Sequence, residues 1–166
     1  PVEETTMLLG AIADDLTGAT DIALAFAREG LRTVQFNGIP NERALASNVD
    51  AVVIALKSEQ FQLSKLYIVE TGCVWLRAHN VKQVVFKYCS TFDSTDKGNI
   101  GPVTEALLEE LGETMTIACP SFPENGRTVF QGHLFVGDTL LSESSMRDHP
   151  LTPMTDSNLI RVLQRQ

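Results

Sequence analysis

Two adjacent acids directly follow an apolar run near the start of the sequence. Asp14 and Asp15 come after "LLGAIA" at 8–13. A carboxylate in such a place can accept a proton from a hydroxyl, bind a sugar hydroxyl or hold a metal. The simpler alternative is that Asp14 caps the following helix and Asp15 is solvated. Two adjacent acids repel each other and a cap needs only one, which favours a chemical role for the pair.

Two lysines also close apolar runs. Lys57, with Ser58 after it, follows "AVVIAL", and Lys87 lies near the end of "QVVFKY". A lysine at such a position is costly to desolvate unless it meets an anion. Extension of the side chain into solvent is the competing interpretation for each of them.

A polar segment at 89–102, "CSTFDSTDKGNIGP", follows the run that contains Lys87. An Asx-type turn would explain only part of it, because the hydroxyl groups exceed what a turn requires. Further along, Arg127 can pair with an anion or with Glu124. The candidate ligand-binding residues of the polar segment are Asp93, Ser94, Thr95, Gly98 and Asn99.

The intervening sequence predicts alternating strands and helices. Because the strands are almost wholly apolar, they indicate an α/β fold with a doubly wound, mostly parallel sheet and helices on both faces. The carboxyl ends of such strands share one edge, where ligands bind, so the polar residues should converge there. The predicted strands are 8–13, 33–36, 51–56, 83–88 and 115–118, and the predicted helices are 17–30, 65–79 and 102–112.

The sequence also indicates how two helices begin and where the alternation of strands and helices ends. Thr17 is a suitable cap for the first helix. After "PSFPENG", residues 127–144 alternate apolar and polar types around two glycines, which predicts a C-terminal β excursion. The last residues begin as a helix for which Asp156 or Ser157 is the expected cap.

Length and composition narrow the function classes. The 166 residues suit one domain, and the net charge of -8 with a pI near 4.8 argues against nucleic acids and anionic membranes as partners. No apolar run is long enough to span a membrane and no signal segment opens the chain. Three widely spaced cysteines favour reduced thiols and a cytoplasmic location, and the histidine spacing predicts no metal site.

Several other α/β classes lack their required residues here. A phosphoacceptor receiver domain needs an aspartate closing the third strand, where this chain has Leu56 and Lys57. A haloacid-dehalogenase phosphatase needs D-x-D, but the acids here are adjacent. The first turn, "ADDLTGA", has one glycine rather than a dinucleotide fingerprint, and no P-loop occurs.

The segments "IADDLTGATD", "ALKS", "FKYCSTFDSTDKGNIGPV", "PSFPENGRTVFQGHLFVG" and "LLSESSMRDHPLTPM" resemble the four-carbon acid sugar kinases. Within that family the resemblance is greatest to the 3-oxo-tetronate 4-kinases, and it runs from 8 to 166 in collinear order. It implies a sugar-acid-binding N-terminal domain over 8–166, with 1–7 a tail or a cloning remnant. ATP and Mg²⁺ would be bound mainly by a separate C-terminal domain, and a homodimer is possible.

The resemblance also implies roles for individual residues. The activity would be ATP-dependent phosphorylation of the terminal hydroxyl of a 3-oxo-tetronate-like acid. From the chemistry of phosphoryl transfer we expect Asp15 to be the base, with Asp14 and Asp93 as the alternatives. Glu59 replaces an arginine usual in relatives, so Lys57 and Lys87 would have to hold the carboxylate. The alternative is a stand-alone sugar-acid-binding module or an inactive truncated homologue. The implied substrate-binding residues are Asp14, Lys57, Ser58, Lys87, Asp93, Ser94, Thr95, Gly98, Asn99 and Arg127.

Overall fold

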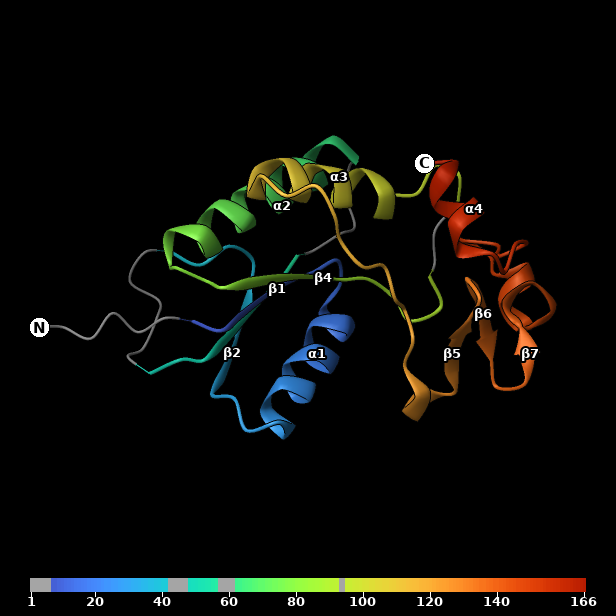
Figure 1. Cartoon of the computed structure of the whole chain (residues 1–166), viewed down its shortest axis with the longest axis horizontal. Coiled ribbons are helices and arrows are strands. Elements are labelled where there is room, and N and C mark those ends of the chain that lie inside the picture. The colour runs from blue at the N-terminus through green and yellow to red at the C-terminus, as the bar shows by residue number, and fades with distance from the viewer. Residues whose placement is uncertain (1–6, 42–47, 57–61, 93–94) are drawn as a thin grey trace, which may run out of the picture. The chain divides into compact units, whose positions relative to one another are not determined.

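The computed structural model describes residues 7–41, 48–56, 62–92 and 95–166, with backbone only for 62–68 (Figure 1). The chain divides into two compact units. Unit 1 comprises Pro1–Lys87 and Glu109–Gly112, and unit 2 comprises Tyr88–Leu108 and Glu113–Gln166.

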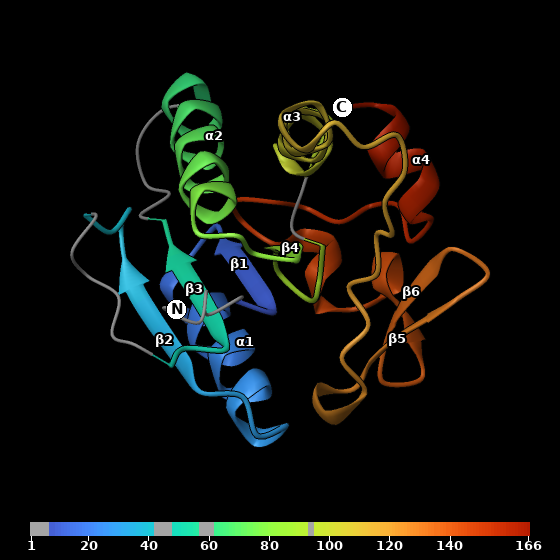
Figure 2. The ribbon, with the colours of Figure 1, turned by 60° about the vertical axis from the view of Figure 1, so that its left-hand side comes forward.

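Unit 1 is built on a parallel four-stranded sheet in the order β2-β3-β1-β4. The parallel arrows of β1, β2 and β3 are visible in Figure 2. Every residue of β3 is buried, as expected for a strand covered on both faces. The parallel sheet and four of the predicted strands are thereby confirmed. The strands are β1 (Leu9–Ala13), β2 (Thr33–Asn37), β3 (Ala51–Ala55) and β4 (Gln83–Lys87).

Helices α1 (Leu16–Arg28) and α2 (Gln62–Ala78) cover opposite faces of this sheet (Figure 1). The apolar face of α1, which includes Ile22 and Phe26, packs on the alanines and valines that point to one side of the sheet. On the other side α2 approaches Ile12 and Gly10. A Cβ on Gly10 would lie only 2.7 Å from Leu76 Cδ2, so this glycine allows the close contact between helix and sheet.

Unit 2 contains a separate antiparallel sheet in the order β5-β6-β7, which confirms the predicted β excursion (Figure 1). Helix α3 (Ile100–Leu111) begins in unit 2 and ends in unit 1. The other elements of unit 2 are η1 (Pro123–Asn125), β5 (Arg127–Phe130), β6 (His133–Val136), β7 (Thr139–Leu140), η2 (Leu141–Glu143), η3 (Ser145–Asp148) and α4 (Leu159–Gln164).

The predicted fifth strand at 115–118 is wrong, because these residues carry no strand structure. Met115 is 82% exposed and Ile117 88% exposed, so the apolar run is not buried. An apolar run becomes a strand only where a neighbouring strand supplies its hydrogen bonds, and that partner cannot be read from the run itself.

The predicted cap of the last helix is also wrong. Asn158, and neither Asp156 nor Ser157, caps α4 by accepting a hydrogen bond from the Arg161 backbone at 3.0 Å. The Asp156 carboxylate instead binds arginine side chains, and the Ser157 hydroxyl binds Ser142.

Across the described ranges, no helix combines the length and the apolar character needed to cross a membrane.

Candidate functional site

The two adjacent acids lie where the chain leaves β1 and enters α1. The backbone N–H of Asp14 donates to the Lys87 carbonyl at 3.2 Å, which continues the pairing between β1 and β4. Asp15 caps α1, since its Oδ1 accepts a hydrogen bond from the Gly18 backbone at 2.7 Å. Asp15 therefore has the capping role that the sequence suggested for Asp14 or Thr17, because its extended backbone lets the carboxylate turn back over the first turn.

Lys87 ends β4 and is in register with Ala13, the last residue of β1. This register places the lysine beside the acids at the carboxyl edge of the sheet, as predicted. The chain runs from β1 through α1 to the outer strand β2, whereas β4 lies on the opposite side of β1. Strand order therefore reverses at this point, which is where open α/β sheets bind ligands.

Gly18 marks the point where the acid and the cation converge. A Cβ built on this residue would lie 3.3 Å from Asp15 Oδ2 and 3.3 Å from Lys87 Nζ. Both charged atoms therefore approach the same spot above the first turn of α1, and any larger side chain would displace them. Gly18 was not among the predicted site residues, although its place in "DDLTGA", inside the first turn of a helix, was a usable signal.

The arrangement offers a ligand two complementary groups. The cap occupies Asp15 Oδ1, and within the described part of the chain it is the only hydrogen bond of that side chain. Oδ2 can therefore accept a hydrogen bond from a ligand hydroxyl, while the neighbouring ammonium of Lys87 suits a ligand carboxylate or phosphate. Asp14 is half-buried, as is Asp15, and its Oδ1 is inaccessible to solvent.

The polar segment at 89–102 lies in unit 2 and contains a residue with a strained backbone. Phe92 is fully buried, yet its φ is +54°, an unfavourable value for a bulky side chain. Edge-on contact with the Tyr88 ring, at 5.4 Å between centroids, and a 2.9 Å bond from its N–H to the Cys89 carbonyl hold it there. Such strain is typical of functional loops.

The rest of this segment forms a tight turn that leads into α3. The Gly98 N–H donates to the Thr95 carbonyl at 2.7 Å, and the Asn99 carbonyl accepts from Val103 at 2.9 Å. Gln166 fixes both ends of the turn: its Nε2 donates to the Thr95 carbonyl at 2.9 Å and its Oε1 accepts from the Gly101 N–H at 2.8 Å. Thr95, Gly98 and Asn99 therefore belong to one tight turn.

Arg127, the first residue of β5, is held by the turn that precedes it in unit 2. Its guanidinium donates to the Asn125 carbonyl, and Gly126 supplies the left-handed backbone that turns the chain. No other side-chain hydrogen bond of Arg127 occurs among the described residues, and its Nε is buried. Of the two partners that the sequence left open for Arg127, an anion or Glu124, the described residues show no ion pair of Arg127 with Glu124. The structure does not join Arg127 to the turn at 95–99 by any such bond.

Four predicted residues, Lys57, Ser58, Asp93 and Ser94, lie outside the described residues. Among the residues that are described, no cluster of three or more histidine, cysteine or acidic side chains is arranged to hold a metal ion.

Known proteins resemble this chain over almost its whole length. The sequence profile of a family described as "Sugar-binding N-terminal domain" matches residues 9–166. Curated relatives named 3-oxo-tetronate kinase are 60% identical in Cupriavidus necator over 162 residues and 62% identical in Pseudomonas fluorescens over 161, each across 96% of this chain. The chain covers 38% and 37% of these relatives, so it spans little more than a third of their length.

Solved structures share the fold. A Salmonella typhimurium structure described as a putative tRNA synthase superposes with a TM-score of 0.93 and 49% identity, over 97% of this chain and 38% of that one. A Bordetella bronchiseptica structure, described as a domain-swapped dimer with bound citrate, has a TM-score of 0.77 and 31% identity, over 94% and 39%. With its profile match over almost every residue, the chain belongs to the family of sugar-binding N-terminal domains.

Proposed function

We propose that the chain is the substrate-binding part of a kinase that phosphorylates the terminal hydroxyl of a four-carbon sugar acid such as 3-oxo-tetronate. The observation that carries this proposal is the convergence of the Asp15 carboxylate and the Lys87 ammonium around Gly18. A short hydroxy acid needs a hydrogen-bond acceptor for its hydroxyls and a cation for its carboxylate. The names of the relatives, 3-oxo-tetronate kinase, support the same substrate class.

In this proposal Asp15 acts as the general base. Phosphoryl transfer depends mostly on positioning and on stabilisation of charge, and a carboxylate close to the acceptor hydroxyl can take its proton. The cap from Gly18 fixes one oxygen of Asp15, which orients the other toward the site. Lys87 would bind the carboxylate at the far end of the substrate. The remaining predicted residues, Asp14, Lys57, Ser58, Asp93, Ser94, Thr95, Gly98, Asn99 and Arg127, stay candidates for its hydroxyls.

ATP and Mg²⁺ belong to the proposal only through the kinase relatives. The sequence has no P-loop, and the described residues offer no cluster of metal ligands, so these residues do not fit a nucleotide–magnesium site. We assign no step of the reaction to such a site here. Nucleotide binding would fall to the part of the relatives that this chain does not match.

A stand-alone sugar-acid-binding module, or an inactive truncated homologue, is the second candidate. The same site supports it, because binding by Asp15 and Lys87 does not require the nucleotide.

We also propose that the protein can form a homodimer, since the Bordetella bronchiseptica structure is described as a domain-swapped dimer.

Calorimetry of ligand binding tests the proposed site. We expect the chain to bind a 2,3,4-trihydroxybutanoate and to bind butanoate, which has the same carboxylate without hydroxyls, much more weakly. The substitution Lys87→Gln should weaken binding of the trihydroxy acid about tenfold or more, because it removes a charge-assisted hydrogen bond. The matched control is Lys82→Gln, since exposed Lys82 directly precedes β4 at the opposite edge of the sheet.

Two results would contradict the proposal. Equal affinity for the trihydroxy acid and butanoate would exclude recognition of the hydroxyls. Equal affinity of the wild type and the Lys87→Gln variant, with both folded, would remove Lys87 from the site.

A further inference from the structure

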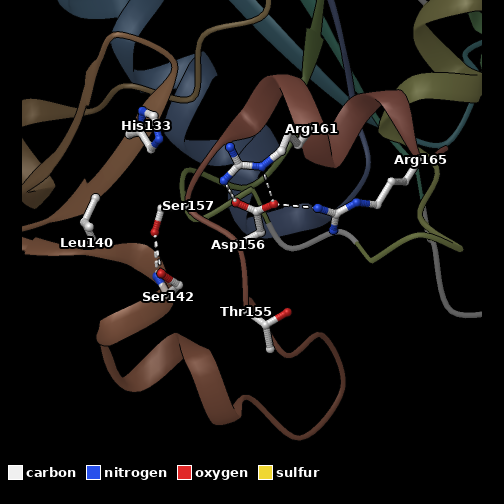
Figure 3. A pocket seen from close by; sticks show the side chains of 8 residues that line it. All are labelled: His133, Leu140, Ser142, Thr155, Asp156, Ser157, Arg161 and Arg165. Carbon is white, nitrogen blue, oxygen red and sulfur yellow. Dashed lines mark hydrogen bonds and ion pairs between the residues drawn. The ribbon is translucent and has the colours of Figure 1, made fainter.

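A pocket of about 460 Å³ lies wholly within unit 2 and has no role in the proposed reaction. Its volume is within the range typical of small-molecule sites. Its walls come from β6, β7, η2, the segment at 155–157 and the helix α4 with its C-terminal end, as the labelled side chains in Figure 3 show. The lining residues are mostly polar: His133, Leu140, Ser142, Thr155, Asp156, Ser157, Arg161 and Arg165.

The two arginines of the pocket converge on Asp156 (Figure 3). Arg161 binds this carboxylate with two hydrogen bonds, from Nε at 2.9 Å and from Nη2 at 2.7 Å. Arg165 adds a third from its Nη2 at 2.5 Å. The two arginines hold the pKa of Asp156 well below its usual range, so the carboxylate stays ionised. The two-bond fork of Arg161 fixes the plane of its guanidinium, whereas Arg165 is held by a single hydrogen bond.

Donor groups remain after these bonds are made. Arg161 uses Nε and Nη2 on Asp156, and its Nη1 makes no hydrogen bond with any other described residue. In Figure 3 this nitrogen points away from Asp156. The Ser142 hydroxyl accepts a bond from Ser157 at 2.9 Å, which leaves the Ser142 proton available to a ligand. Fixed donors with unused protons are suited to the oxygen atoms of an anion.

The charges of the lining residues favour the same class of ligand. Two arginines face one aspartate, and His133 uses both ring nitrogens on neutral partners, the Gln131 carbonyl at 3.0 Å and the Asn158 amide at 3.4 Å. Asp96 also approaches Arg165, at 3.6 Å, but it does not line the pocket and its side chain is 67% exposed, so solvent screens it. The lining is thus locally positive in a chain with a net charge of -8.

We propose that this pocket is a binding site for a small oxyanion group, a phosphate or a carboxylate carried by a metabolite, with Arg161 as its main ligand and Asp156 as the residue that positions Arg161. The Ser142 hydroxyl supplies a second, neutral donor. Phosphate and carboxylate share this recognition chemistry because both offer negatively charged oxygens to a planar guanidinium.

NMR titration of the whole 166-residue chain with inorganic phosphate, and separately with malonate, tests the site and distinguishes the two sources of the oxyanion. We expect saturable shifts of the backbone amides of Ser142, Ser157 and Arg161 with at least one probe. The substitution Arg161→Gln should weaken that binding about tenfold or more. Arg147→Gln is the matched control, because exposed Arg147 belongs to η3 of the same unit and does not line the pocket.

Three outcomes would overturn the proposal. The first is that neither phosphate nor malonate causes saturable shifts at these amides. The second is that Arg161→Gln binds the probe as tightly as the wild type. The third is that Arg147→Gln loses as much affinity as Arg161→Gln. A comparison of amide spectra shows whether Arg161→Gln is folded. If it is not, Ser142→Ala replaces it, with an expected loss of several-fold. Shifts confined to Asp15 and Gly18 would assign the anion to the sheet-edge site instead, and would leave the proposed function standing.

Discussion

Substitution of Asp15 by asparagine and by alanine separates its capping role from its proposed binding role. Its carboxylate caps α1 through a 2.7 Å bond from Gly18. Asparagine caps about as well as aspartate, whereas alanine lowers the free energy of unfolding by about 1 kcal/mol. Both variants also lose the attraction between the carboxylate and the helix dipole, about 0.3–1 kcal/mol. The alanine variant should therefore be about 1 kcal/mol less stable than the asparagine variant.

Ligand affinity should follow a different pattern. If Asp15 Oδ2 accepts a hydroxyl of the sugar acid, both variants lose a hydrogen bond to a charged group. That loss corresponds to about 1.5–3 kcal/mol, or about ten- to a hundredfold in affinity. Urea denaturation measures stability, and calorimetry with a 2,3,4-trihydroxybutanoate measures binding. Wild-type affinity in the asparagine variant would refute the reasoning, because it would leave Asp15 with the helix cap alone.

Three further predictions concern other residues. Gly18→Ala should keep or raise the melting temperature, since alanine is favoured over glycine in helices. The same substitution should weaken sugar-acid binding, because the new Cβ displaces the side chains of Asp15 and Lys87, and unchanged affinity would contradict this. Hydrogen bonds from the Arg32 side chain and backbone lower the pKa of Asp50 to about 2, so their contribution to stability is present above about pH 4 and is lost as the pH falls toward 2. Denaturation across that window should show a smaller decline for Asp50→Asn than for the wild type, and equal slopes would count against it. Finally, the chain should show no saturable ATP binding by calorimetry, because it has no P-loop, and micromolar affinity would disprove this.

Most of the fold could be predicted because its elements are encoded locally. The apolar runs at 8–13 and 51–56 are too short for helices and too apolar for surface strands, so they had to be buried in a parallel sheet. The run at 115–118 is also mostly apolar, but its side chains are exposed. The apolar composition of a segment shows that it could be a buried strand. It does not show whether a neighbouring strand is present to form hydrogen bonds with it.

The convergence of Asp15 and Lys87 could also be predicted, from the direction of the strands. Parallel strands bring their carboxyl ends to one edge, so the convergence of Asp15 and Lys87 needed only the strand assignment. Sequence reasoning missed the role of Gly18, because a glycine in the first turn of a helix signals a close approach without showing which side chains make it. It also placed a cap on Asp14 or Thr17, since several neighbouring residues had suitable side chains and only backbone geometry could choose between them.

By itself, then, the sequence determined the alternating α/β order, the parallel sheet and the edge at which the charged residues gather, because hydrophobic periodicity and strand direction are local properties. Only the tertiary structure decided which acid caps α1, how closely Asp15 and Lys87 approach Gly18, and that Arg161 and Arg165 meet on Asp156 beside Ser142. These features depend on distances between side chains brought together by packing, and the order of residues along the chain does not contain those distances.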